Sequence, residues 1–202
     1  SLTPARAAKQ QKFTYSLWVK RGILTTDNRN MLSSGTSGTA RTDILFDAGL
    51  GGTDDLLFIY SNGANNYGCY TSAVFRDPSA WYHVVISVDT TQATAANRVL
   101  MYVNGVQQTT NANPTYGFVP QNTNLFINST NAHSIGSNAY SVGALFDGYM
   151  TEINFIDGQE LTPSSFGETN TLTGQWVAKK YTGTYGTNGF YLPFTNGTST
   201  TT

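Results

Sequence analysis

The sequence predicts an all-β protein, one antiparallel β-sandwich with a single short helical turn. Short apolar runs that alternate with polar residues recur along the chain, and Gly and Asn clusters separate them. Long helical periodicity is absent, and strands do not alternate with helices, which argues against an α/β enzyme fold. At 202 residues the chain is long enough to bury the core of one large sandwich without disulfides.

The first strand is predicted over residues 12–20, where apolar and polar side chains alternate as in a strand with one buried face. The remaining runs have the spacing of an antiparallel sandwich. Further strands are predicted at residues 41–47, 55–60, 66–75, 81–89, 98–103, 106–108, 125–128, 145–156 and 190–194.

Turn chemistry places the breaks between these strands. Asn104 and Gly105 suit a type I′ turn, because both residues tolerate positive φ. Thr162 is predicted as an N-cap with Pro163 at the first helical position, which gives one short turn of helix. Pro193 makes the last strand an edge or terminal strand.

Three motifs in order resemble the laminin-G-like family. The family's WxHV…D strand and LYVNG hairpin are similar to Trp81–Asp89 followed by Leu100–Gly105. Its FTxSxWVK strand is similar to Phe13–Lys20, and its FxGxIDEV strand is similar to Phe146–Ile153. The resemblance implies a concanavalin A-like jelly roll. We expect an N-terminal arm at 1–11, the sandwich at 12–195 and a polar linker or tail at 196–202.

The closing segments 155–168 and 185–192 resemble laminin-G-like modules in virion proteins of marine tailed bacteriophages. This resemblance implies a domain displayed in many copies on a capsid, tail or fibre, at a virion surface or otherwise outside the cell. Its partners would be host-surface or extracellular glycans and other virion subunits.

Composition argues against two classes of partner. The formal net charge is −1 and the pI is near 6.0, without the basic excess of a nucleic-acid-binding protein. No apolar run approaches the roughly 20 residues that cross a bilayer, so no membrane partner is expected. The single cysteine, Cys69, excludes an internal disulfide and is predicted as a buried packing residue.

The sequence predicts a protein that is not an enzyme. Glycosidases of this architecture need a pair of suitably spaced carboxylates, and no acidic pair here matches the ExDxE pattern of the laminarinase-like relatives. Of the two histidines, we expect His83 to be a hydrogen-bonded structural residue and His133 to be solvated. Glycoside hydrolysis is a minor alternative.

Calcium is a cofactor that the laminin-G resemblance implies. Asp47, Asp54 and Asp55 flank a glycine-rich loop whose carbonyls would converge on an ion. The alternative is that these acids cap turns and add solubility.

Glycan binding requires an aromatic platform for the apolar sugar face and amides for the hydroxyls. We expect Trp18 and Trp81 to lie in the core. The sequence does not decide between a core position and a binding role for Trp176. The loops offer six candidates: Asn65, Asn66, Tyr67, Tyr116, Asn138 and Tyr140. The alternative for each tyrosine is that it packs against its neighbouring loop. The predicted function is adhesion or glycan recognition, and the alternative is a purely structural virion subunit.

Overall fold

The computed structural model describes residues 2–24, 27–46, 49, 54–141 and 143–194. Its strands are β1 (Lys12–Arg21), β2 (Arg29–Ser37), β3 (Ala40–Phe46), β4 (Asp55–Asn62), β5 (Asn66–Val74), β6 (Tyr82–Asp89), β7 (Val99–Val103), β8 (Val106–Gln107), β9 (Thr110–Ala112), β10 (His133–Ile135), β11 (Gly148–Asp157), β12 (Gly167–Thr169), β13 (Trp176–Ala178) and β14 (Phe190–Leu192). Two short 3₁₀ turns, η1 (Ala95–Asn97) and η2 (Pro163–Ser165), are its helical elements in these residues.

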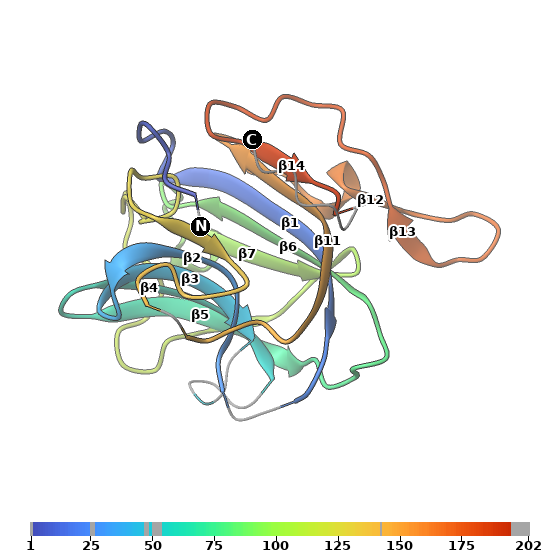
Figure 1. Ribbon diagram of the computed structural model, residues 1–202, viewed down its shortest axis with the longest axis horizontal. Coiled ribbons are helices and arrows are strands. Elements are labelled where there is room, and N and C mark those ends of the chain that lie inside the picture. The colour runs from blue at the N-terminus through green and yellow to red at the C-terminus, as the bar shows by residue number, and fades with distance from the viewer. Residues whose placement is uncertain (1, 25–26, 47–48, 50–53, 142, 195–202) are drawn as a thin grey trace.

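Two six-stranded antiparallel sheets form a sandwich, which confirms the predicted fold class (Figure 1). Sheet A has the order β10-β2-β3-β4-β5-β9, and sheet B has the order β14-β11-β1-β6-β7-β8. The remaining strands, β12 and β13, pair as a hairpin that projects from the body of the molecule. Within the described residues, no helix combines the length and apolar character needed to cross a membrane.

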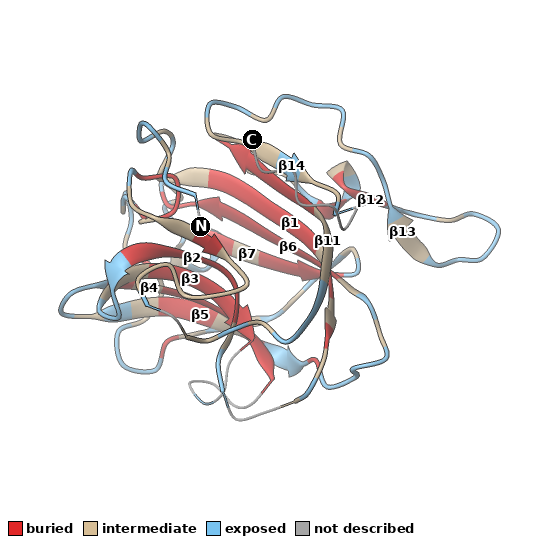
Figure 2. Ribbon diagram, in the orientation of Figure 1, coloured by how far each residue is buried: buried red, intermediate tan, exposed pale blue. Residues whose placement is uncertain are grey.

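The main core lies between the inner faces of the two sheets (Figure 2). On β1 the alternating side chains Phe13, Tyr15, Leu17 and Val19 are fully buried there, as the period-two pattern predicts. Cys69 is buried in the same core as a free thiol, which confirms its predicted packing role.

The outer face of sheet B is also buried, because residues 158–189 fold back across it. Val85, Tyr102 and Ile156 of sheet B form a second apolar cluster with Phe166 from this covering segment. Strand β1 is therefore covered on both faces, and even Thr14 is buried. The hydroxyl of Thr14 is satisfied by the carbonyl of Gln159 and the amide of Leu161, both in the covering segment.

Several predicted elements differ from the structure. Residues 125–128 form a turn rather than a strand, although Leu125 and Ile127 are buried in the core. Residues 145–147 precede β11, and Trp81 precedes β6 with 41% of its surface exposed instead of lying in the core. The predicted turn at Asn104 and Gly105 is confirmed, with φ of 49° and 82°.

The predicted helical turn is present as η2, but its cap differs from the prediction. Thr162 makes no hydrogen bond from its side chain to the backbone of the turn. Its hydroxyl instead lies 2.9 Å from the hydroxyl of Ser164. The last strand, β14, occupies the edge of sheet B as predicted from Pro193.

Candidate functional site

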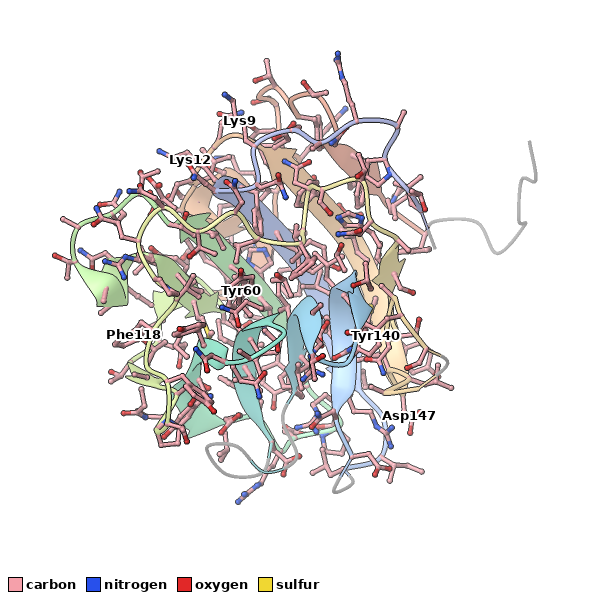
Figure 3. The ribbon with its side chains drawn as sticks, turned by 90° about the vertical axis from the view of Figure 1, so that its left-hand side faces the viewer. Lys9, Lys12, Tyr60, Phe118, Tyr140 and Asp147 are labelled. Atoms are coloured by element: carbon pink, nitrogen blue, oxygen red, sulfur yellow. The ribbon has the colours of Figure 1, made fainter. Side chains whose placement is uncertain are left out.

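Of the six predicted glycan-binding residues, Asn65, Asn66, Tyr67 and Tyr116 lie at or beside the β4–β5 turn, at one end of sheet A. The ring of Tyr140 lies near Gly38 in the neighbouring β2–β3 turn, whereas the side chain of Asn138 bonds to Asn30 near the start of β2. The two turns are joined through the carbonyl of Thr39, which accepts hydrogen bonds from the amide of Gly63 and from the hydroxyl of Ser61 at 2.6 Å. Figure 3 looks onto this end and shows Tyr60 and Tyr140 across it. We call it the hairpin-end surface: residues 37–43, 60–68, 113–118 and 137–141.

One part of this surface is an aromatic cluster, the Tyr116 subsite. The ring of Tyr67 stacks on Tyr60 with centroids 6.3 Å apart and meets Tyr116 edge-on at 6.1 Å. Tyr116 is 42% exposed, and the amide of Asn65 donates to the hydroxyl of Tyr67 at 3.0 Å. Asn66 is exposed beside them. The subsite thus offers an open ring face beside side-chain amides.

Buried groups hold the loop that presents Tyr116. The side-chain oxygen of Asn113, a residue 5% exposed, accepts hydrogen bonds from the backbone amides of Thr115 and Tyr116 at 2.9 and 3.1 Å. The amide of Gly68 on β5 also donates to the carbonyl of Gly117. This Asx-type turn fixes the backbone that carries Tyr116 before any ligand arrives.

The second part is a polar cluster, the Tyr140 subsite, on the outer face of strands β2 and β3. The hydroxyl of Tyr140 donates to Asn138 at 3.2 Å and lies 3.4 Å from the carboxylate of Asp43. Arg41 pairs with Asp43 at 2.8 Å, and its guanidinium carbon lies 5.8 Å from the centre of the Tyr140 ring. Ser33 donates to Asp43 at 2.7 Å.

The electrostatics of this subsite centre on a buried carboxylate. Burial raises the pKa of Asp43 to about 6, although the hydrogen bond from Ser33, the charge of Arg41 and the hydroxyl of Tyr140 all act to lower it. Asn30, 1% exposed, donates to Asn138, while its own side-chain oxygen has no hydrogen-bond partner among the residues that the structure describes. An acceptor without a partner is costly unless a ligand or water supplies a donor.

The predicted calcium residues are only partly described. Asp47 lies outside the described residues, and Asp55 is buried at the start of β4. The two oxygens of Asp54 are each held by a guanidinium, from Arg21 at 2.7 Å and Arg76 at 3.0 Å. In the described part of the chain no group of three or more His, Cys, Asp or Glu side chains is arranged to hold a metal ion. Calcium binding stays a prediction.

Both histidines are structural. His83 is fully buried, 2.9 Å from the hydroxyl of Ser16 and 2.9 Å from the indole nitrogen of Trp176, which confirms the interpretation from the sequence. The prediction of a solvated His133 is wrong, because its two ring nitrogens bond to the amide of Asn128 and the carbonyl of Asn131.

Sequence reasoning missed Arg41 and Asp43 as members of the surface, and Asn30 as the residue that holds the side chain of Asn138. Asp43 sits in an apolar strand run, and its contact with Tyr140 joins residues 97 positions apart. A pattern of neighbouring residues in the sequence cannot predict a contact over this separation. The signal that was present is the charge itself, because an acidic residue inside a predicted buried strand needs a partner.

The comparisons with known proteins agree with this architecture. A model described as the concanavalin A-like lectin/glucanases superfamily, of laminin-G type, matches residues 1–165. No curated protein sequence matches the chain.

Among solved structures, domain 4 of AbnA, an extracellular arabinanase from Geobacillus stearothermophilus solved with arabinotriose, is 20% identical over 79% of this chain and 68% of its own, with a TM-score of 0.53. A Bacteroides ovatus protein assigned to carbohydrate binding is 22% identical over 81% of this chain, with a TM-score of 0.53, and this chain covers 41% of it. Domains LG4-5 of the mouse laminin α1 chain are 13% identical over 79% of this chain and 40% of theirs, with a TM-score of 0.51. These likenesses show the fold.

Proposed function

The chain belongs to the concanavalin A-like lectin/glucanases superfamily, and we propose that it is a non-catalytic module that binds glycans through the hairpin-end surface. The observation that carries the proposal is that two kinds of group border the hairpin turns of sheet A, the Tyr116 subsite on the side of the main core and the Tyr140 subsite on the outer face. The Tyr116 subsite provides an exposed ring, and the Tyr140 subsite provides amide, hydroxyl and carboxylate groups. Rings and polar groups of these kinds recognise the two faces of a sugar.

The setting of the proposal is outside the cell, at a virion surface. Its support is the sequence resemblance of the closing segments to phage virion modules, together with a sequence that is rich in Ser, Thr, Asn and Gly and has only 11% charged residues. A shallow sugar site binds weakly as a single copy, and display in many copies multiplies affinity by about 10²–10⁴. Other virion subunits would be the partners that array it.

The proposal of a non-enzymatic role rests on the carboxylates. Hydrolysis of a glycosidic bond requires two of them about 5–10 Å apart, flanking the bond. Within the described residues, Asp43 has no second carboxylate among its contacts in the Tyr140 subsite, and it is paired with Arg41. Glycoside hydrolysis therefore stays the minor alternative.

A purely structural virion subunit is the second candidate, and one observation favours it. The β12–β13 hairpin projects from the body (Figure 1) and carries Leu172, 93% exposed, at its tip. The turn is ordered by Asn170, whose side-chain oxygen accepts from the amides of Leu172 and Thr173. An apolar side chain presented on a fixed turn suits a contact with a neighbouring subunit.

The first test is a glycan-array screen with the protein clustered on beads, in calcium and in chelator. We expect selective binding, reduced about tenfold or more by Tyr140→Ala or Tyr116→Ala, because each change removes a ring that contacts the sugar. Tyr149→Ala is the matched control, since Tyr149 is 67% exposed at the start of β11.

The outcomes separate the candidates. Binding lost in chelator would support the calcium prediction at Asp47, Asp54 and Asp55. Absence of binding by clustered, folded protein would remove the glycan proposal and favour the structural subunit. In that case self-association abolished by Leu172→Asp would support the structural role directly.

A further inference from the structure

A cavity of about 440 Å³ opens at the edge of the sandwich between β10 and β14. Sheet A contributes Leu32 and Ile135 to its wall, and sheet B contributes Phe155, Phe190 and Leu192. These are inner-face side chains, so the cavity continues the main core outward where the sheets separate. Its volume lies within the range of about 300–1,000 Å³ that is typical of small-molecule pockets.

The polar residues in the wall make their hydrogen bonds inside the protein. His133 uses both ring nitrogens, bonding Asn128 and Asn131. The side-chain nitrogen of Asn188 donates to Asn128 at 2.9 Å and to the carbonyl of Arg6 at 3.0 Å. Because these donors and acceptors are occupied, a ligand gains nothing by bringing polar groups inside, and a hydrocarbon suits the wall.

The part of the chain that follows the cavity is unsuited to fill it. Phe194, at the rim, is the last described residue. Residues 195–202 contain only Thr, Asn, Gly and Ser, so they offer no apolar side chain.

An arginine is bonded through its backbone to a residue in the wall of the cavity. Arg6 is exposed on the N-terminal arm, is joined by its carbonyl to Asn188 in the wall, and forms no ion pair within the described residues. The carboxylate nearest in this bonding network, Asp157, is buried and already accepts hydrogen bonds from four N–H groups. An exposed cation on a segment bonded to the wall of an apolar cavity complements an amphiphile with an anionic head.

We infer that this cavity binds a medium-chain fatty acid, with its hydrocarbon chain between the sheets and its carboxylate in solvent beside Arg6. This site is separate from the hairpin-end surface, and the inference does not depend on glycan binding.

The test is calorimetric titration of the whole chain with dodecanoate, below the concentration at which it forms micelles. We expect one molecule to bind per chain. Leu192→Trp and, separately, Ile135→Trp should weaken binding about tenfold or more, because the larger ring occupies the space of the hydrocarbon. Val106→Trp, on exposed β8 at the opposite edge of sheet B, should leave the affinity unchanged.

The head group is tested with Arg6→Gln. This variant should weaken dodecanoate about two- to fivefold, as expected for one exposed charge pair, and leave dodecanol unaffected. Equal loss for both ligands would overturn the role of Arg6. No dodecanoate binding by folded protein, or binding that both tryptophan variants leave intact, would overturn the site. Glycan binding measured on the same variants reports on the hairpin-end surface alone.

Discussion

At the residue scale, two hydrogen bonds and a stacked ring fix the orientation of the buried His83 side chain. The indole nitrogen of Trp176 can only donate, so Nδ1 of His83 accepts and Nε2 carries the proton toward Ser16. The imidazole also stacks on Trp18, with centroids 5.1 Å apart. These contacts require the neutral ring, and burial lowers the pKa of His83 to about 4.

This shift predicts a loss of stability in acid. Between pH 6.5 and pH 4 the unfolded chain binds a proton at His83 that the folded chain does not bind. As the pH falls through this window, the free energy of unfolding therefore decreases by on the order of 3 kcal/mol. The raised pKa of Asp43 has the opposite effect on the free energy of unfolding over nearly the same pH range, because there the folded chain binds the proton more tightly than the unfolded chain. The measurement is therefore a comparison of urea unfolding at pH 4 to 7 for the native sequence and for His83→Gln. Identical pH slopes in the two proteins would contradict the prediction.

At the element scale, the β12–β13 hairpin is attached to sheet B chiefly through one ring. Trp176 stacks on His83 with centroids 6.0 Å apart and lies against the β7–β8 turn, where a Cβ on Gly105 would be 2.9 Å from the indole. A Cβ on Gly167, within the hairpin, would be 2.5 Å from the same ring. Both glycines are thus needed for the ring to fit.

We expect Trp176→Ala to destabilise the fold by about 2–3 kcal/mol, less than the value for a fully buried tryptophan because this ring is half-buried. The loss should be local, with faster amide hydrogen exchange at 167–178 than in the main core. Trp81→Ala removes an exposed ring and is the matched control, with an expected change within about 0.5 kcal/mol. Uniform acceleration across both sheets would argue against a local attachment.

Strand prediction succeeded where one side of the strand is apolar. The strands β1, β4, β6 and β7 show this pattern, and the structure places their apolar side chains in the core. Strand β2 was missed because residues 33–37 are Ser, Ser, Gly, Thr and Ser, so its apolar side ends at Leu32. Conversely, the apolar run at 125–128 forms a turn whose side chains Leu125 and Ile127 are buried in the core. A short apolar run indicates burial but does not define the backbone conformation.

The sequence proposed residues for the candidate site but not their arrangement, and their role in binding stays a prediction. Aromatic and amide residues in loops identified Tyr116 and Tyr140 as candidates. The position of Tyr116 beside Tyr67 and the contact of Tyr140 with Asp43 both join residues far apart in the sequence. Such contacts follow from strand pairing, which the one-dimensional pattern does not contain.

At the scale of the whole molecule, the sandwich has two cores that share sheet B. The main core lies between the sheets, and the second lies between sheet B and the covering segment 158–189. The family model ends at residue 165, so most of this cover lies beyond the matched region. The last strand, β14, also comes from this region and completes the edge of sheet B.

This arrangement predicts that the matched region does not form a stable fold alone. A fragment of residues 1–165 loses Phe166, Tyr181 and Tyr185 from the second core, and it uncovers Val85, which is fully buried in the whole chain. Burial of a single large apolar side chain is worth about 1.5–3 kcal/mol, and several are lost against a total stability of about 5–15 kcal/mol.

The fragment should therefore melt well below the whole chain, bind a dye specific for exposed apolar surface, and aggregate at concentrations where the whole chain stays dispersed. The control is a chain ending at Phe194, which retains every described contact of the cover and should melt with the full sequence. A 1–165 fragment that unfolds cooperatively at the temperature of the whole chain would show that the second core contributes little. The covering segment would then be an appendage to a self-sufficient sandwich, and the buried polar row of Thr14, Ser16 and His83 would have to be stable when exposed to water.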